Sequence, residues 1–397
     1  MNDISKITEL LVKIAEVGNQ HPSPPLLNEL FPFRHYFDEN GKLLRNKLSE
    51  NDGLWTRREI LTRFLYLQAV LDQGPDIVGI RQLTRDVTNH LYEKEVRFLH
   101  KPLDFFKEVG ISVDEIWQSH EAVKSIRAVP WAKENKSTPG KYNLFMDNAK
   151  QVLGYAVYRW GVPLAVPYLR EKDLGAKGEE SNEPLVDYLE SYSSGEMMSQ
   201  AMKDDERYGL GKAIGDKAAH LFAKWYIHTF ALCRRVDTSW DGLSYELPLD
   251  SNAGRVLFRT GFLMELATLE NYKSAKWDVI QIGKGKGKEN YIRVTNIRDK
   301  KTDAFAMNSD LGQKYQEIAT QHLKTHKRAP ESIRIQRIFN AILKGTQYCI
   351  GHLDDGIIHI GTTYCRNHET PHCKECPINK HCEGYQKHSE WITDYRT

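Results

Sequence analysis

The stretch CRNHETPHCKECPINKHC, residues 365–382, holds four of the six cysteines of the chain. Cys365, Cys373, Cys376 and Cys382 have the spacing C-x7-C-x2-C-x5-C, which is short enough for one loop to fold around one site. Clustered thiols of this kind are typical of a metal centre. Thiolate sites suit zinc or an iron–sulfur cluster. Zinc modules usually present two C-x2-C pairs and only one occurs here, so the spacing alone leaves both metals open.

The composition is that of an ordinary soluble globular protein. The chain has 397 residues, 40% hydrophobic and 27% charged, and a formal net charge of +2. This length suggests two packed units, and so small a net charge means that any nucleic-acid binding must come from local basic patches. The N-terminal residues form an amphipathic pattern rather than a signal peptide, and no apolar run reaches the roughly 20 residues of a membrane span. We therefore expect a cytoplasmic protein with no membrane part.

Helical periodicity dominates the sequence. It predicts helices over residues 55–71 and 143–169, with loops at 133–141 and 172–184. The one β signal is a pair of β-branched runs over 278–297 around the turn KGKGKE. The fold class expected is all-α, with a small β-hairpin insertion.

The segment GLGKAIGDKAAHLFAKWYIHTF, residues 209–230, predicts a helix that begins near Asp216. The tight turn before it contains Gly211 and Gly215. A glycine turn at a helix N-terminus presents free backbone N–H groups and can bind a phosphate. The alternative is an ordinary packing corner between two helices.

The segment YELPLDSNAGRVLFRTGFLMEL, residues 245–266, places Asp250 at the start of a further helix. An acid at this position is most often an N-cap. Whether Asp250 has a second role depends on what surrounds it.

Together these segments resemble the helix–hairpin–helix DNA glycosylases that carry an iron–sulfur cluster, such as endonuclease III and the oxidised-guanine glycosylases. The family's hairpin L-P-G-V-G-x-K-x-A corresponds here to K-A-I-G-D-K-A-A, and its V-P-V-D helix start to L-P-L-D. Its C-x6-C-x2-C-x5-C loop corresponds to residues 365–382, which share the pattern P-x-C-x-x-C-P. The chain departs from the family at Ala213, which replaces the first hairpin glycine, and by one extra residue in the first cysteine gap.

The resemblance implies roles for individual residues. Asp250 would be the catalytic acid, Lys217 the lysine of the bifunctional enzymes, and the four cysteines the ligands of a [4Fe–4S] cluster, with zinc as the alternative. DNA contacts are expected from the hairpin, from the catalytic helix and from the basic stretch around residues 283–301. These contacts are Gly211, Lys212, Gly215, Arg255, Arg259, Lys284 and Lys286.

The resemblance also implies an architecture: two helical units that flank a DNA-binding cleft. We expect an N-terminal helical segment over residues 1–54 and a helical domain over 55–230 that ends in the helix–hairpin–helix motif. Residues 231–397 would hold the catalytic helix, the basic hairpin insertion and the cysteine loop.

The function expected is excision of a damaged or modified base from double-stranded DNA by a monomeric enzyme. In this chemistry the sugar develops positive charge, which a carboxylate at Asp250 stabilises. Lys217 is either the nucleophile, which adds strand cleavage, or a phosphate contact beside an attacking water. The biological use is either repair of oxidised bases or removal of modified cytosines from phage DNA. The rival hypothesis is a non-catalytic DNA-binding module stabilised by a metal.

Overall fold

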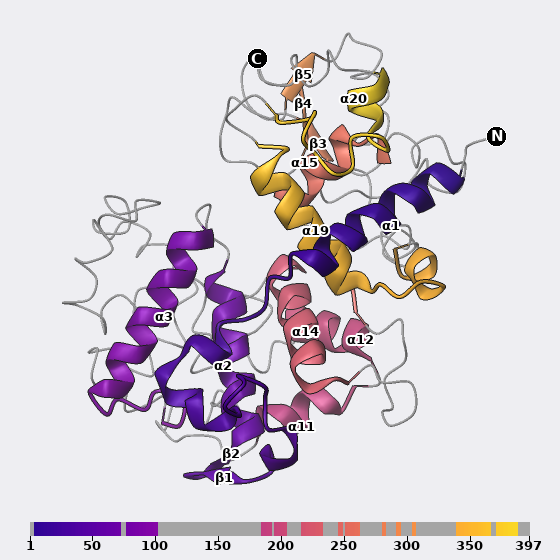
Figure 1. Cartoon of the computed structure of the whole chain (residues 1–397). Helices are drawn as coiled ribbons and strands as arrows, with labels where there is room; N and C mark the ends of the chain where they lie inside the picture. The colour runs from indigo at the N-terminus through magenta and orange to yellow at the C-terminus, as the bar shows by residue number, and fades with distance from the viewer. Residues whose placement is uncertain are drawn as a thin grey trace. The chain divides into compact units, whose positions relative to one another are not determined.

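Helices make up most of the described part of the chain, which agrees with the mainly α-helical class that the sequence predicts (Figure 1). The structure is a computed structural model that divides into two units, with residues 1–23 and 246–397 in unit 1 and residues 24–245 in unit 2. The residues that it describes are 4–72, 77–101, 184–192, 194–204, 216–232, 245–248, 251–262, 280–282, 291–294, 304–306, 339–366 and 371–387. Four predicted segments lie outside these residues: the helix over 143–169, the loops over 133–141 and 172–184 (except residue 184), and the glycine turn of the hairpin.

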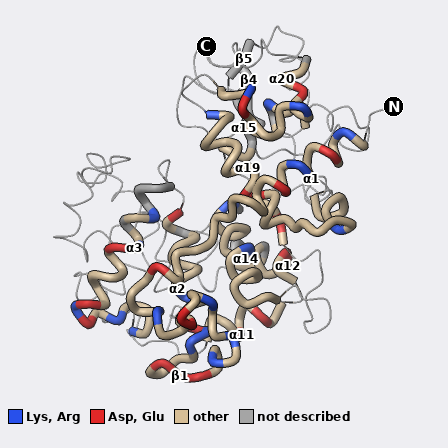
Figure 2. The backbone as a smooth tube through the Cα atoms, in the orientation of Figure 1, with Lys and Arg blue, Asp and Glu red and all other residues tan. Residues whose placement is uncertain are grey.

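Unit 1 is built around the pairing of its first and one of its last helices. Its helices are α1 (Ile4–Gln20), α15 (Ser251–Arg259), α19 (Ile350–Thr363) and α20 (Glu383–Lys387). Figure 1 shows α1 lying across α19, and the two make the most extensive helix contact in the described chain. The apolar stripe of α1 is buried in this contact, while charged positions of alternating sign lie between the stripe residues (Figure 2). A helix with this pattern needs a partner for its apolar face, and α19 is that partner.

Two glycines bring α1 and α19 into direct backbone contact. A Cβ atom placed on Gly18 would lie 1.8 Å from the carbonyl oxygen of His352. One placed on Gly356 would lie 1.9 Å from the carbonyl oxygen of Ile14. No side chain fits at either position, so the crossing requires glycine on both helices.

The start of α15 is held against α19 in a similar way. The Nδ2 of Asn252 donates to the carbonyl oxygen of Ile357 at 3.3 Å, and a Cβ on Gly361 would lie 2.1 Å from the Oδ1 of Asn252. α15 begins directly after Asp250, as predicted, and it ends at Arg259, two residues before Gly261 adopts a φ of +87°. The helix that begins at Ser251 is therefore fixed at a short distance from the helix that leads to the cysteines.

The predicted β-hairpin is confirmed and gains a third strand. β3 (Ile280–Ile282) pairs antiparallel with β4 (Tyr291–Val294), and Gln281 faces Arg293 in the register. β4 also pairs antiparallel with β5 (Ala304–Ala306), a strand that sequence periodicity does not indicate. In unit 1 this sheet lies against α15.

Unit 2 packs its helices around α2 (Arg57–Leu71). The predicted stripe of α2 is buried, and the Oγ1 of Thr56 caps the helix by accepting from the N–H of Glu59 at 3.2 Å. The other elements are α3 (Ile77–Glu93), α11 (Leu185–Glu190), α12 (Gly195–Asp204), α14 (Asp216–Phe230), the short 3-10 turns η1 (Leu27–Glu29), η2 (Phe31–Tyr36) and η3 (Arg45–Lys47), and the hairpin β1 (Asn51–Asp52) and β2 (Trp55–Thr56). The helix predicted to begin near Asp216 is thus confirmed. Among the helices described, none combines the length and apolar character that a membrane crossing would need.

A buried ion pair joins three parts of unit 2. The Oε1 of Glu59 accepts from the Nε of Arg63 at 2.7 Å, and both side chains are at most 1% exposed. The Nη1 of Arg63 donates to the carbonyl oxygen of Leu99 at 2.9 Å. The two carboxylate oxygens of Glu59 also accept from the N–H groups of Leu185 and Val186, each at 2.9 Å. One carboxylate therefore neutralises a buried cation and holds the start of α11.

Glu59→Gln is expected to lower the free energy of unfolding of unit 2 by about 3–5 kcal/mol, because it leaves the buried guanidinium of Arg63 without its negative partner. Urea unfolding followed by far-UV circular dichroism measures this change. Glu16→Gln is the control, since Glu16 forms a partly exposed pair with Lys13 at 2.7 Å and its loss is expected to cost about 1 kcal/mol or less. Equal effects of the two substitutions would contradict the prediction.

Candidate metal centre

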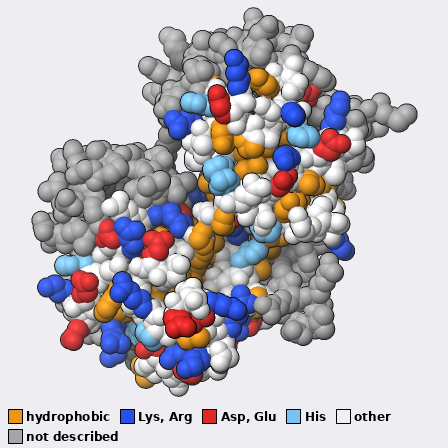
Figure 3. All heavy atoms as spheres, viewed as in Figure 1, with side chains coloured by type: hydrophobic (Ala, Val, Ile, Leu, Met, Phe, Trp, Pro, Cys, Tyr) orange, Lys and Arg blue, Asp and Glu red, His pale blue; other side chains and the backbone are white. Residues whose placement is uncertain are grey.

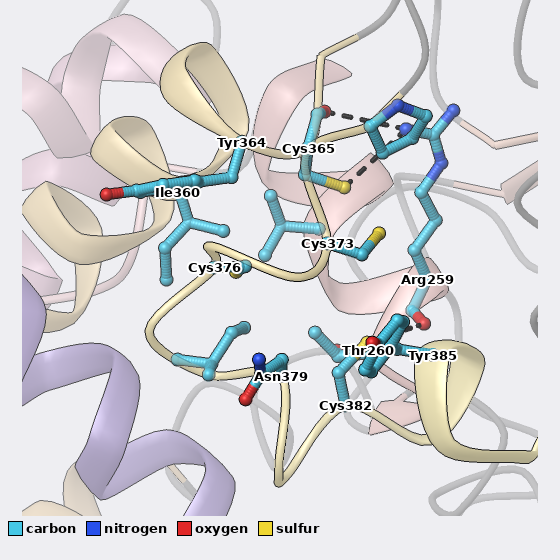
Figure 4. A pocket seen from close by; sticks show the side chains of 13 residues that line it. Arg259, Thr260, Ile360, Tyr364, Cys365, Cys373, Cys376, Asn379, Cys382 and Tyr385 are labelled. Atoms are coloured by element: carbon cyan, nitrogen blue, oxygen red, sulfur yellow. Dashed lines mark hydrogen bonds between the residues drawn. The ribbon is translucent and has the colours of Figure 1, made fainter.

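The four clustered cysteines line one pocket of unit 1 (Figure 4). Cys365, Cys373, Cys376 and Cys382 come from the end of α19, from the loop that follows it and from the residue before α20. Residues of α15 and α19 complete the wall. All five cysteines that the structure describes are free thiols. The four thiols that the sequence predicts at one site thus line the same pocket, and the metal site itself stays a prediction.

Tight turns explain how the loop gathers them. The N–H of Cys365, two residues after α19 ends, donates to the carbonyl oxygen of Ile360 at 2.8 Å. The N–H of His372 then donates to the carbonyl oxygen of Tyr364 at 2.8 Å and returns the chain to that point. The N–H of Cys376 donates to the carbonyl oxygen of Cys373 at 3.3 Å, so the C-x2-C pair forms a turn of its own.

The end of α15 is docked on the last part of the loop. The N–H of Glu383 donates to the carbonyl oxygen of Thr260 at 3.0 Å. A Cβ on Gly384 would lie 2.1 Å from the carbonyl oxygen of Arg259, so the two backbones touch there. The segment that begins after Asp250 and the segment that carries the cysteines are therefore packed together in one unit.

Arg259 lies inside this pocket wall rather than on the surface. Arg259 is only 2% exposed. Its Nη1 lies 3.5 Å from the Sγ and 3.5 Å from the carbonyl oxygen of Cys365, and it donates to the carbonyl oxygen of Arg366 at 3.0 Å. The DNA contact predicted for Arg259 needs an exposed guanidinium, whereas this one is in the interior of unit 1.

Burial controls the ionisation of two of the thiols. It raises the pKa of Cys376 to about 12, and it raises the pKa of Cys382 to about 12 as well, with further contributions from the neighbouring thiols of Cys365 and Cys373. Without a bound metal these two groups are therefore protonated at neutral pH. A metal ligand must be a thiolate, so a bound metal would have to supply the positive charge that stabilises the ionised form.

The donor set suits a metal that prefers sulfur, because four thiols line one pocket, with Cys376 buried and the other three partly exposed. Among the residues described, no group of three or more His, Cys, Asp and Glu side chains is arranged to hold a metal ion. The identity of the metal is therefore a proposal that rests on the spacing of the cysteines and on the pocket that they share.

The remaining predicted site residues fall into two groups. Lys217 is the second residue of α14 in unit 2, and its Nζ donates to the carbonyl oxygen of Asp72 at the end of α2. Arg255 lies in α15, but the structure does not describe its side chain. The others lie outside the described residues: Gly211, Lys212, Gly215, Asp250, Lys284 and Lys286.

Sequence reasoning did not single out Asn252, which holds α15 to α19. The only signal in the sequence is a short amide near a helix start, which is as typical of a cap as of a packing contact. Comparisons with models of protein families, with curated proteins and with solved structures found no match for this chain. Its own residues therefore have to support any functional proposal.

Proposed function

We propose that this protein is an iron–sulfur DNA glycosylase that excises a damaged or modified base. One observation carries the proposal: the helix that follows Asp250 is docked on the loop that holds the four cysteines. These two segments are more than a hundred residues apart in sequence, and they are two of the three elements on which the resemblance to the helix–hairpin–helix glycosylases rests. The contact between these two segments in unit 1 supports the interpretation that their motifs form one shared pattern and do not match by chance.

The metal proposed is a [4Fe–4S] cluster held by Cys365, Cys373, Cys376 and Cys382, with zinc as the alternative. Four thiols in one pocket suit both. When bound, such a cluster would fix the shape of the loop and, through Thr260 and Glu383, the position of the end of α15. Bond breaking is assigned to residues elsewhere, so the role proposed for the metal is structural.

The chemistry proposed for Asp250 is electrostatic. Cleavage of the bond between base and sugar develops positive charge on the sugar, and a carboxylate beside the sugar stabilises that charge. The target base has to leave the duplex first, because an active site cannot reach it inside the stack. Lys217 supplies either the attacking amine or a contact to phosphate. In the structure its ammonium is held at the end of α2 by the carbonyl oxygen of Asp72.

The partner proposed is double-stranded DNA, bound by a monomer in the cytoplasm of a bacterium or an archaeon. On the face shown in Figure 3, basic and acidic side chains of the described residues are intermixed. The positive charge for phosphate binding is therefore proposed to come from the stretch around residues 283–301, with Lys284 and Lys286. Repair of oxidised bases and removal of modified cytosines from phage DNA both fit this partner.

Base release from defined duplexes tests the proposal. The purified protein is incubated with oligonucleotides that contain oxidised guanine, thymine glycol, uracil or glucosylated hydroxymethylcytosine, and the released base is measured by mass spectrometry. Release from at least one of them supports the glycosylase and indicates its use. Binding to these duplexes without any release would favour the non-catalytic binding module instead.

Two further measurements separate the open alternatives. Iron and sulfide analysis after anaerobic purification, with the broad absorbance near ~400 nm of an iron–sulfur protein, distinguishes the cluster from colourless zinc. Borohydride trapping of a covalent adduct between the active enzyme and DNA distinguishes an attack by Lys217 from an attack by water.

A further inference from the structure

The position of Arg259 indicates a structural role that the sequence motifs do not suggest. It is the last residue of α15, and it touches the cysteine loop at both of its ends. The guanidinium reaches Cys365, the first cysteine, with its Nη1 3.5 Å from the sulfur. The backbone carbonyl oxygen lies 3.4 Å from the Sγ of Cys382, the last cysteine. Figure 4 shows the side chain running along one wall of the pocket toward Cys365.

The charge of the pocket changes when the cysteines bind a metal. Four thiolates around Zn²⁺, or around a [4Fe–4S] core of the same positive charge, leave a net charge of about −2 in the interior. A buried charge is unfavourable unless an opposite charge lies close to it. A guanidinium is protonated at every physiological pH and sits beside the first sulfur, so it supplies a positive charge at the place where the negative charge would form.

We infer that Arg259 is a positioning residue for the metal centre, whose guanidinium donates to the thiolate of Cys365 and retains the metal group in the loop. The inference rests on the proposed metal centre and holds for a cluster or for zinc, because both leave the same net charge. It concerns the thiolates of the loop and not DNA, which separates it from the surface role that the sequence suggests for this residue.

The geometry also favours arginine over lysine. The same Nη1 lies within 3.5 Å of the sulfur and of the carbonyl oxygens of Cys365 and Arg366. The planar guanidinium can donate to the backbone of the loop and to the sulfur at once. An ammonium group keeps the positive charge but lacks the forked set of N–H donors. A lysine at this position should therefore preserve part of the effect.

Retention of the metal group is the measurement that tests this inference. The full-length wild type, Arg259→Gln and Arg259→Lys are purified anaerobically and their iron, sulfide and zinc contents are determined. Each loaded protein is then exposed to excess chelator and a mild oxidant, and loss of the metal is followed by absorbance near ~400 nm or with a zinc dye. Arg259→Gln is expected to lose its metal about tenfold faster than the wild type or more, with Arg259→Lys in between.

Two controls make the result specific. Arg366→Gln removes an arginine next to Cys365 whose Nε donates to the carbonyl oxygen of Thr362 at 3.2 Å at an exposed position, and it should retain metal like the wild type. Thermal unfolding of the metal-free proteins separates retention from folding: Arg259→Gln should lower the midpoint of the loaded protein more than that of the metal-free protein.

The outcomes distinguish this inference from the proposal on which it rests. Equal rates of metal loss for the wild type, Arg259→Gln and Arg366→Gln would overturn the inference while the metal centre stands. An equal drop in the unfolding midpoints of the loaded and metal-free proteins would also overturn it, since Arg259 would then only pack. A wild type that takes up neither iron and sulfide nor zinc would remove the metal centre itself.

Discussion

Asp250→Asn is expected to reduce base release by roughly 10²- to 10³-fold while leaving the stability of the protein almost unchanged. Asp250 directly precedes α15, so two roles compete for it, a helix cap and a catalytic carboxylate. Asparagine caps a helix about as well as aspartate does, whereas it carries no charge. The substitution therefore keeps the first role and removes the second. Single-turnover release of base from the best duplex, together with thermal unfolding, measures both.

The control for this prediction is an acid in the first turn of another helix. Asp187 occupies that position in α11 and is exposed. Asp187→Asn should change the interaction with its helix dipole by about 1 kcal/mol or less and should leave base release intact. DNA affinity measured by fluorescence anisotropy should be similar for both variants and the wild type. If Asp250→Asn released base at the wild-type rate, Asp250 would be a cap and nothing more.

Periodicity predicted the elements whose own residues set their structure. The stripe of α2 and that of α14 have helical spacing, and both helices begin within two residues of the predicted start. The β-branched runs that became β3 and β4 are likewise a local signal. β5 was missed because its residues, Ala304–Ala306, include no β-branched side chain, unlike those of β3 and β4.

Pairing between distant segments could not be predicted in this way. The stripe of α1 shows that one face is buried, but it does not show that α19, more than 300 residues later, covers it. Gly18 and Gly356 are unremarkable in the sequence, since a glycine within a helix has many explanations. Only the crossing shows why both positions need glycine.

The candidate site also has one part that local sequence predicts and one part that depends on tertiary contacts. The spacing of the cysteines predicts that they share one place, because they lie within one short loop. The position of Arg259 is set by where α15 ends against the loop, which is a tertiary contact. The resemblance predicts a surface position for Arg259, the last residue of α15, whereas the interior position gives it a thiol as its neighbour.

Gly356→Ala is expected to destabilise unit 1 by about 3 kcal/mol or more, although alanine is the better helix former. The added Cβ would lie 1.9 Å from the carbonyl oxygen of Ile14, and a backbone atom cannot rotate away as a side chain can. α1 and α19 would have to separate, and the buried stripe of α1 would lose its packing. Because α19 ends two residues before Cys365, the same change should also speed the loss of the proposed metal. Urea unfolding and metal retention measure the two effects.

The glycines of the crossing also predict a result that separates this explanation from a general intolerance of alanine. Gly345→Ala is the control, since nothing lies within 4 Å of a Cβ at that exposed position, and its effect should be below about 1 kcal/mol. Gly18→Ala should be as damaging as Gly356→Ala, because its Cβ meets the carbonyl oxygen of His352 at 1.8 Å. Each substitution forces the same separation of the same two helices, so the double variant should lose little more than either single variant. Strict additivity would mean that the two glycines act at independent places, and the crossing would then not be the reason for either.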